Sequence, residues 1–425
     1  MSSDQPQEIF IQRSSMFNRI NSVGRMLRRI GLDPFRLNSD KLLKKAARRA
    51  AFKEELPAST QLGLRKLVDS INAEAQVNPF GSLAIKGLLE RTLHGRMKVE
   101  QTLESNPAIL DREIRQPVFI IGMPRTGTTI LHALMHEDPE HRSPLAWECL
   151  LPHPVPQPVD FTSNASLRTV EKEFGQLFKL VPDFERKHHM TAASPQECIG
   201  INFLDFNSFQ TCAQVYIPSY LDWFSNEADR LSTMRFHKRF LQYLESGGVR
   251  GERWLLKSPV HLMRLEEIFE VYPDARIIMT HRHPAKVIPS AASLISSVRS
   301  LYSDEEDPVR SGAEQSEVWN SYFNRFLESR KKLNKEEQII DLMFDDFIKD
   351  QMDMVRSIYQ RFGWNLSEEA ERKMRAFLDA NPKDKHGAHN YTLEQFGLTE
   401  AGIEEQYRDY IQFLNRLAAS KGQTA

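Results

Sequence analysis

A short apolar run, a glycine-containing loop and a helical pattern follow one another within residues 117–139, and this succession constrains the fold more than any other feature. Pro117 breaks the preceding helical pattern, and residues 118–121 form an apolar run rich in β-branched side chains, as expected of a buried strand. Residues 122–129 read GMPRTGTT, and residues 130–135 then have a helical pattern. Strand, glycine loop and helix in this order predict a P-loop-type α/β fold.

Three further strands are expected downstream, at residues 254–256, 276–280 and 338–343. Helical patterns separate them, for example over residues 287–295. Strands that alternate with helices favour a mostly parallel sheet flanked by helices. Ligands of such sheets bind beyond the carboxyl ends of the strands, and the motifs described below all fall at those ends.

The first part of the chain is predicted to be a helical extension, residues 1–115, added to an α/β domain over residues 116–425. Residues 13–53 contain twelve lysines and arginines against two aspartates. Apolar residues recur there at helical spacing, namely Ile20, Val23, Met26, Leu27 and Ile30. Two interpretations stay open: a solvated amphipathic helix packed on the body, or a helix that binds a membrane surface or a partner.

Charge and cysteine content exclude several classes of protein. The net charge of −1 provides no overall field for nucleic acid. Cys149, Cys198 and Cys212 form no C-x-x-C pair, which argues against a disulfide framework or a cysteine zinc site. The first residues lack a secretory pattern, and no window approaches the roughly 18 apolar residues of a membrane span. We therefore expect a cytoplasmic protein without a metal, with membrane association through the basic segment left open and the oligomeric state undetermined.

The glycine loop has the G-x4-G spacing of a phosphate-binding loop, but its cation is in an unusual place. Thr128 stands where an ATP- or GTP-binding loop carries its lysine, and Arg125 lies inside the loop instead. Backbone N–H groups and the dipole at the start of the following helix favour an anion there. The loop therefore suits a single 5′-phosphate that carries another anionic group, without the β/γ-phosphate pair and Mg²⁺.

Three segments together resemble the PAPS-dependent sulfotransferases, in particular the broad branch of bacterial and tyrosylprotein enzymes (PAPS is 3′-phosphoadenosine 5′-phosphosulfate). Residues 117–139, PVFIIGMPRTGTTILHALMHEDP, resemble the family's 5′-phosphosulfate-binding loop. Residues 276–294, RIIMTHRHPAKVIPSAASL, resemble its 3′-phosphate-binding segment, and residues 255–262, LLKSPVHL, resemble the segment of its catalytic lysine. The resemblance implies a sulfotransferase domain that moves a sulfuryl group from PAPS to a hydroxyl acceptor, releasing PAP (3′-phosphoadenosine 5′-phosphate).

The resemblance also assigns roles to individual residues. It implies that the 5′-phosphosulfate is held by Arg125, Thr126, Gly127, Thr128 and Thr129, with Arg125 also acting in catalysis. Lys257 would stabilise the departing nucleotide, and Arg282 with Ser290, eight residues later, would bind the 3′-phosphate. Phe344 after the fourth strand either stacks on adenine or packs in the core. Residues 383–391, KDKHGAHNY, either close over the nucleotide or form a solvated loop.

A hydroxyl acceptor also needs a general base. Glu148 is favoured, because tyrosylprotein sulfotransferases carry a catalytic glutamate just after the helix that follows the loop. Pro259 occupies the place of the histidine used by the cytosolic enzymes, so the open alternatives are His188, His189 and His261.

The density of aromatic residues over 174–224 indicates core packing or the wall of an apolar pocket, and from it we expect an apolar small molecule or a lipid as acceptor. Two rival functions are disfavoured. The missing loop lysine argues against a P-loop kinase or NTPase, and the presence of Arg125, Lys257 and Arg282 argues against an inactive nucleotide-binding scaffold.

Overall fold

A computed structural model describes residues 9–30, 36–161, 164–181, 191–249, 251–382 and 391–422. Its centre is one five-stranded sheet with the order β2-β3-β1-β4-β5, in which every pair of neighbours is parallel. This confirms the predicted fold class. Four strands coincide with the expected segments, and β2 was missed because two residues are too short to show a periodicity. The strands are β1 (Val118–Gly122), β2 (His141–Arg142), β3 (Arg253–Lys257), β4 (Arg276–His281) and β5 (Ile339–Met343).

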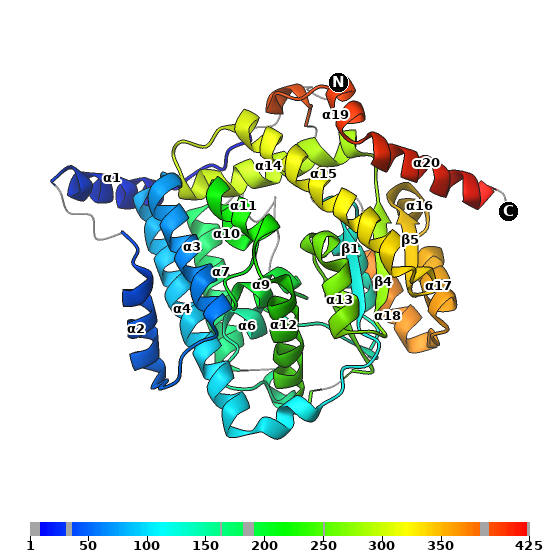
Figure 1. The fold of residues 1–425 in the computed structure, drawn as a ribbon, viewed down its shortest axis with the longest axis horizontal. Helices are drawn as coiled ribbons and strands as arrows, with labels where there is room; N and C mark the ends of the chain where they lie inside the picture. Colours follow the sequence, from blue (N-terminus) through cyan, green and yellow to red (C-terminus); the bar gives the residue numbers. More distant parts are fainter. Residues whose placement is uncertain are drawn as a thin grey trace.

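Alternate residues of β1 enter two different cores, because successive side chains of a strand point to opposite faces of the sheet. Val118 and Ile120 pack on one face, and Phe119 and Ile121 pack on the other. Figure 1 shows α17 and α18 on one side of the strands and α12 and α13 on the other. The apolar run that predicted β1 is thus buried on both faces.

Helices make up most of the remaining described chain (Figure 1). Their bounds are α1 (Ser15–Arg29), α2 (Ser39–Ala50), α3 (Ala58–Glu74), α4 (Pro79–Ser105), α5 (Thr128–His136), α6 (Ala146–Leu150), α7 (Ala165–Leu180), α9 (Cys198–Phe203), α10 (Gln210–Gln214), α11 (Pro218–Asn226), α12 (Arg230–Glu245), α13 (Leu265–Val271), α14 (Pro284–Tyr302), α15 (Pro308–Leu333), α16 (Phe344–Lys349), α17 (Gln351–Phe362), α18 (Glu368–Ala380), α19 (Glu400–Gln406) and α20 (Arg408–Gly422). Within the described ranges, no helix is both long and apolar enough to cross a bilayer.

The second half of the expected helical extension contains two long helices, α3 and α4. The break occurs at Asn78, whose side chain accepts a hydrogen bond from the backbone N–H of Gly81 and caps α4. Pro79 follows at the first turn, where its missing N–H costs nothing. α4 then contributes Leu89 and Leu93 to the same core as Phe119 of the sheet.

Candidate active site

The loop between β1 and α5 is held by its threonine and glycine. Gly127 precedes α5 with φ 88°, a left-handed conformation that glycine adopts without strain. A Cβ atom there would lie 3.0 Å from Cδ2 of Phe344, so the close approach of the two segments also requires glycine. The hydroxyl of Thr126 donates to the carbonyl of Met123 at 2.6 Å and lies 2.6 Å from Oγ1 of Thr280 on β4. The loop is therefore fixed to the neighbouring strand.

The two predicted arginines meet at the carboxyl ends of β1 and β4. Nε of Arg125 donates to Oγ of Ser290 at 3.1 Å, and a guanidinium nitrogen of Arg282 donates to the carbonyl of Arg125 at 3.2 Å. The guanidinium of Arg282 also lies over the ring of Phe344, 4.2 Å from its centre. Burial lowers the pKa of Arg282; Asp345 opposes this effect and Arg125 adds to it. An arginine starts from so high a pKa that the site still carries two positive charges at neutral pH.

Lys257 ends β3 and is almost fully buried. Its Nζ atom lies 3.4 Å from Oγ1 of Thr129, at the start of α5, and forms an ion pair with Glu197. Glu197 stands just before α9, and its side chain keeps 29% of its surface exposed. This glutamate was not predicted from the sequence, because no motif marks it and only the fold brings residue 197 to residue 257.

Glu148, the expected base, lies inside the protein with no exposed surface. One carboxylate oxygen forms an ion pair with Arg142, and the other accepts the backbone N–H of Leu145 at 2.8 Å. Both oxygens thus have donors in this structure. The segment of Glu148 is hydrogen-bonded to the one before Glu197, through the backbone N–H of Gln196 and the carbonyl of Pro144 at 2.7 Å. The role of Glu148 as base stays a prediction.

His261 belongs to a buried group with Cys198 and His237, whose potential ligand atoms all lie within 4.8 Å of one another. Neither ring nitrogen of His261 has a hydrogen-bond partner among the described residues. Burial, together with the charges of His237 and Arg264, holds the pKa of His261 well below its ordinary value. The positive charge of buried Arg264 would equally oppose a divalent cation, so we assign no metal here. His188 and His189 lie outside the described residues.

The aromatic residues of the segment 174–224 are largely core. Those buried in the main core are Phe203, Phe206, Phe209, Tyr220, Trp223 and Phe224. A separate apolar cluster surrounds Trp147 of α6, which packs with Val170, Phe161 and Phe174. The backbone N–H of Trp147 donates to Ala192, so this cluster adjoins the segment that leads to Glu197. Residues 383–390, most of the expected closing loop, lie outside the described part of the chain.

The chain is similar in sequence and in fold to known sulfotransferases. The model of the sulfotransferase family matches residues 117–368. The omega-hydroxy-beta-dihydromenaquinone-9 sulfotransferase Stf3 of Mycobacterium tuberculosis (strain CDC 1551 / Oshkosh) is 25% identical over 330 residues, which are 74% of this chain and 77% of Stf3. Among solved structures, the sulfotransferase STF9 from Mycobacterium avium superposes with a TM-score of 0.81 and 29% identity, covering 88% of this chain and 96% of STF9. The sulfotransferase STF1 from Mycobacterium tuberculosis H37Rv has a TM-score of 0.78 and 28% identity, covering 88% of this chain and 99% of STF1.

Proposed function

The chain belongs to the sulfotransferase family, and from this membership we propose that it transfers a sulfuryl group from PAPS to a hydroxyl group of an apolar acceptor. The family match covers more than half of the chain and includes all three segments whose resemblance to sulfotransferases was predicted. Donor, acceptor and residue roles are the parts that we propose.

The meeting of Arg125, Arg282 and Ser290 at one sheet edge is the observation that carries the choice of donor. PAPS has anionic groups at its 5′ and 3′ positions. The loop over residues 125–129 offers backbone N–H groups and Arg125 to the 5′-phosphosulfate. The planar fork of Arg282 and the hydroxyl of Ser290 suit the 3′-phosphate. The ring of Phe344 packs against the guanidinium of Arg282. This ring either stacks on adenine as well or only positions the arginine.

Lys257 is proposed to stabilise the charge that develops during transfer. As the acceptor oxygen bonds to sulfur, the bond between sulfur and the 5′-phosphate oxygen breaks, and that oxygen becomes anionic. The ammonium of Lys257 lies beside Thr129 at the start of α5, and we assign it the stabilisation of this oxygen. The lysine thus acts mainly on the transition state, with a smaller effect on binding of the donor.

Glu197 fits the role of general base better than Glu148 in this structure. A base must reach the proton that it removes. Glu197 is partly exposed and touches Lys257, whereas Glu148 is fully enclosed and pairs with Arg142. We propose that Glu197 accepts the proton of the acceptor hydroxyl, and that Glu148 holds Arg142 and the start of α6.

The acceptor is proposed to carry its hydroxyl on an apolar body. The cluster around Trp147 and Phe174 adjoins the segment that leads to Glu197 and offers an apolar wall. The relative Stf3 is named for an omega-hydroxylated dihydromenaquinone, a hydroxylated lipid. Both observations support a lipid or another apolar alcohol. Peripheral contact with a membrane would suit such an acceptor.

Incubation with ³⁵S-labelled PAPS and a panel of lipid alcohols, sterols, phenols and sugars tests this function. We expect transfer to an apolar hydroxyl without added Mg²⁺. Lys257→Ala should abolish most of this transfer while PAP still binds. Transfer of phosphate from ATP instead, or a sugar or peptide tyrosine as best acceptor, would contradict the donor or the acceptor assignment respectively.

A further inference from the structure

Exposed apolar side chains are concentrated in one short part of the described chain. Within the described ranges, ten large apolar residues have exposed side chains, and five of them lie between residues 10 and 30. They are Phe10, Met16, Val23, Met26 and Ile30, with exposed fractions of 45% to 64%. Such a concentration on a folded surface indicates a binding face.

One face of α1 packs against the rest of the protein, opposite the exposed apolar side chains. Phe17 is fully buried, and Oδ1 of Asn21 accepts the backbone N–H of Phe80 at 2.9 Å. Gly24 packs so tightly on Pro79 that a Cβ atom would lie 2.2 Å from the proline Cβ. These residues, at positions i, i+4 and i+7, form one helix face. The protein therefore fixes which side of α1 faces outward.

The outward face of α1 is apolar. Met16, Val23 and Ile30 are seven residues apart, so they share one side of the helix, and Met26 lies beside them. Figure 1 shows α1 at the edge of the molecule, projecting beyond the end of α4. The face is thus accessible to a broad, flat partner.

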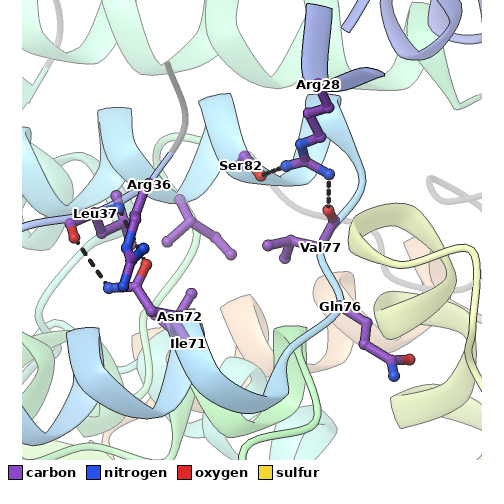
Figure 2. Close-up of a pocket in the computed structure, with 9 residues that line it drawn as sticks. Arg28, Arg36, Leu37, Ile71, Asn72, Gln76, Val77 and Ser82 are labelled. Carbon is purple, nitrogen blue, oxygen red and sulfur yellow. Dashed lines mark hydrogen bonds between the residues drawn. The ribbon is translucent and has the colours of Figure 1, made fainter. Parts of the chain in front are cut away.

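Cations accompany this apolar face. Arg19 and Arg29 are exposed on α1, and neither forms an ion pair or hydrogen bond with another described residue. A cavity of about 410 Å³ lies below α1, with Arg28 and Arg36 on opposite sides of it (Figure 2). A guanidinium nitrogen of Arg28 donates a hydrogen bond to the hydroxyl of Ser82 on α4 at 2.8 Å, whereas the side chain of Arg36 is exposed. Positive charge beside exposed apolar side chains matches the anionic headgroups and acyl chains of a lipid surface.

We propose that the outer face of α1 docks onto the surface of an anionic phospholipid bilayer. Met16, Val23, Met26 and Ile30 enter the boundary between headgroups and acyl chains, while Arg19 and Arg29 contact lipid phosphates. The inner face stays on the protein, so docking needs no unfolding of α1. The proposal goes beyond sulfuryl transfer and does not depend on the donor or acceptor proposed above.

Co-sedimentation of the full chain with vesicles tests this docking, in the absence of PAPS and acceptor. We expect binding to phosphatidylcholine vesicles that contain phosphatidylglycerol, and much weaker binding to phosphatidylcholine alone. Arg19→Glu with Arg29→Glu should weaken binding at least about 25-fold, because each cation near an anionic surface contributes about fivefold. Arg372→Glu with Arg416→Glu, exposed on α18 and α20, changes the net charge equally and should have little effect.

A second pair of variants tests the apolar contribution. Met16→Ser, Val23→Ser and Met26→Ser together should abolish most binding with an unchanged melting temperature. The matched control changes three exposed apolar residues elsewhere, Leu110, Val159 and Val309, to serine and should bind normally. The proposal is overturned if the wild type does not bind anionic vesicles. It is also overturned if either control variant loses as much vesicle binding as the α1 variant with which it is matched. It is also overturned if the α1 variant instead dissociates a dimer in analytical ultracentrifugation, since a second copy would then cover this face.

Discussion

Arg282 provides the most direct test of the nucleotide site at the scale of single residues. We expect Arg282→Ala to weaken PAP binding by about 1.5–3 kcal/mol, the usual range for a hydrogen bond to a charged group, and to affect 5′-AMP much less. Isothermal calorimetry with both nucleotides measures the difference. Arg276, at the other end of β4, provides the control, and Arg276→Ala should leave PAP affinity nearly unchanged. If Arg282→Ala lost equal affinity for PAP and for 5′-AMP, Arg282 would not be the ligand of the 3′-phosphate.

We predict different effects of replacing Glu197 and Glu148: the first should affect turnover and the second stability. Glu197→Gln should lower kcat by about 10²–10⁴-fold, the usual contribution of a positioned base. PAP binding should persist or strengthen, because the variant removes a negative charge beside Lys257. Glu148→Gln should instead lower the free energy of unfolding by about 3 kcal/mol, because it leaves the buried Arg142 without its counter-ion.

Turnover, PAP affinity and thermal unfolding of both variants separate these roles. A Glu148→Gln protein that is as stable as the wild type but inactive, beside an active Glu197→Gln protein, would return the role of base to Glu148. Glu137→Gln provides a control on an unrelated carboxylate, which lies just after α5 and forms no ion pair with another described residue.

At the scale of elements, a charge network joins β4, β5 and α15 below the nucleotide site. Asp341 accepts hydrogen bonds from His281 and Arg330, each at 2.8 Å. Burial alone would raise the pKa of Asp341, but these hydrogen bonds and positive charges outweigh it and hold the pKa well below its ordinary value. The network therefore fixes the last strand, and with it Phe344, against the loop at Gly127.

This network predicts a dependence of stability on pH. The pKa of Asp341 is lower in the folded than in the unfolded chain, so its contribution is complete above the ordinary aspartate pKa of about 4 and is lost as pH falls below it. Asp341→Asn should cost about 3 kcal/mol at neutral pH and flatten the acid limb of the stability curve. Denaturant unfolding across pH checks this, with the more exposed Glu336→Gln as a control expected to cost less than about 1 kcal/mol. An unchanged acid limb in Asp341→Asn would contradict the assignment.

At the scale of the whole molecule, the helical extension and the sheet share one core. Leu64, Leu67 and Leu93 pack in the same buried cluster as Phe119 and Leu256 of the sheet. A partly buried ion pair adds to this contact, because Glu100 of α4 binds Arg239 of α12 at 2.6 Å. We propose that the division predicted at residues 115 and 116 separates two regions that fold together.

Truncation tests this proposal. A chain that begins at residue 116 should fail to unfold cooperatively, because the removed helices cover part of the main core. A chain that begins at residue 36 loses α1 and the contribution of Ile11 and Phe17 to a small separate cluster, and should keep a cooperative transition and PAP binding. Differential scanning calorimetry measures both. A stable, cooperative chain from residue 116 would establish the extension as a separate domain.

The sequence by itself determined the local parts of this protein. Short apolar runs placed β1, β3, β4 and β5. The signal is clearest in β1, because burial on both faces of the sheet leaves a continuous apolar run. The carboxyl ends of parallel strands lie at one edge of the sheet. Arg125, Lys257 and Arg282 each follow or end such a strand, so the order of residues alone predicts that they share one site.

Only the tertiary structure decided which distant side chains meet. The pairing of Lys257 with Glu197, the enclosure of Glu148 by Arg142 and the grouping of Cys198 with two histidines leave no pattern in the sequence. The apolar positions of α1 were visible as a helical period, but a period does not say which face packs inward. That choice depends on contacts such as Gly24 on Pro79, which form only when segments far apart in the chain come together.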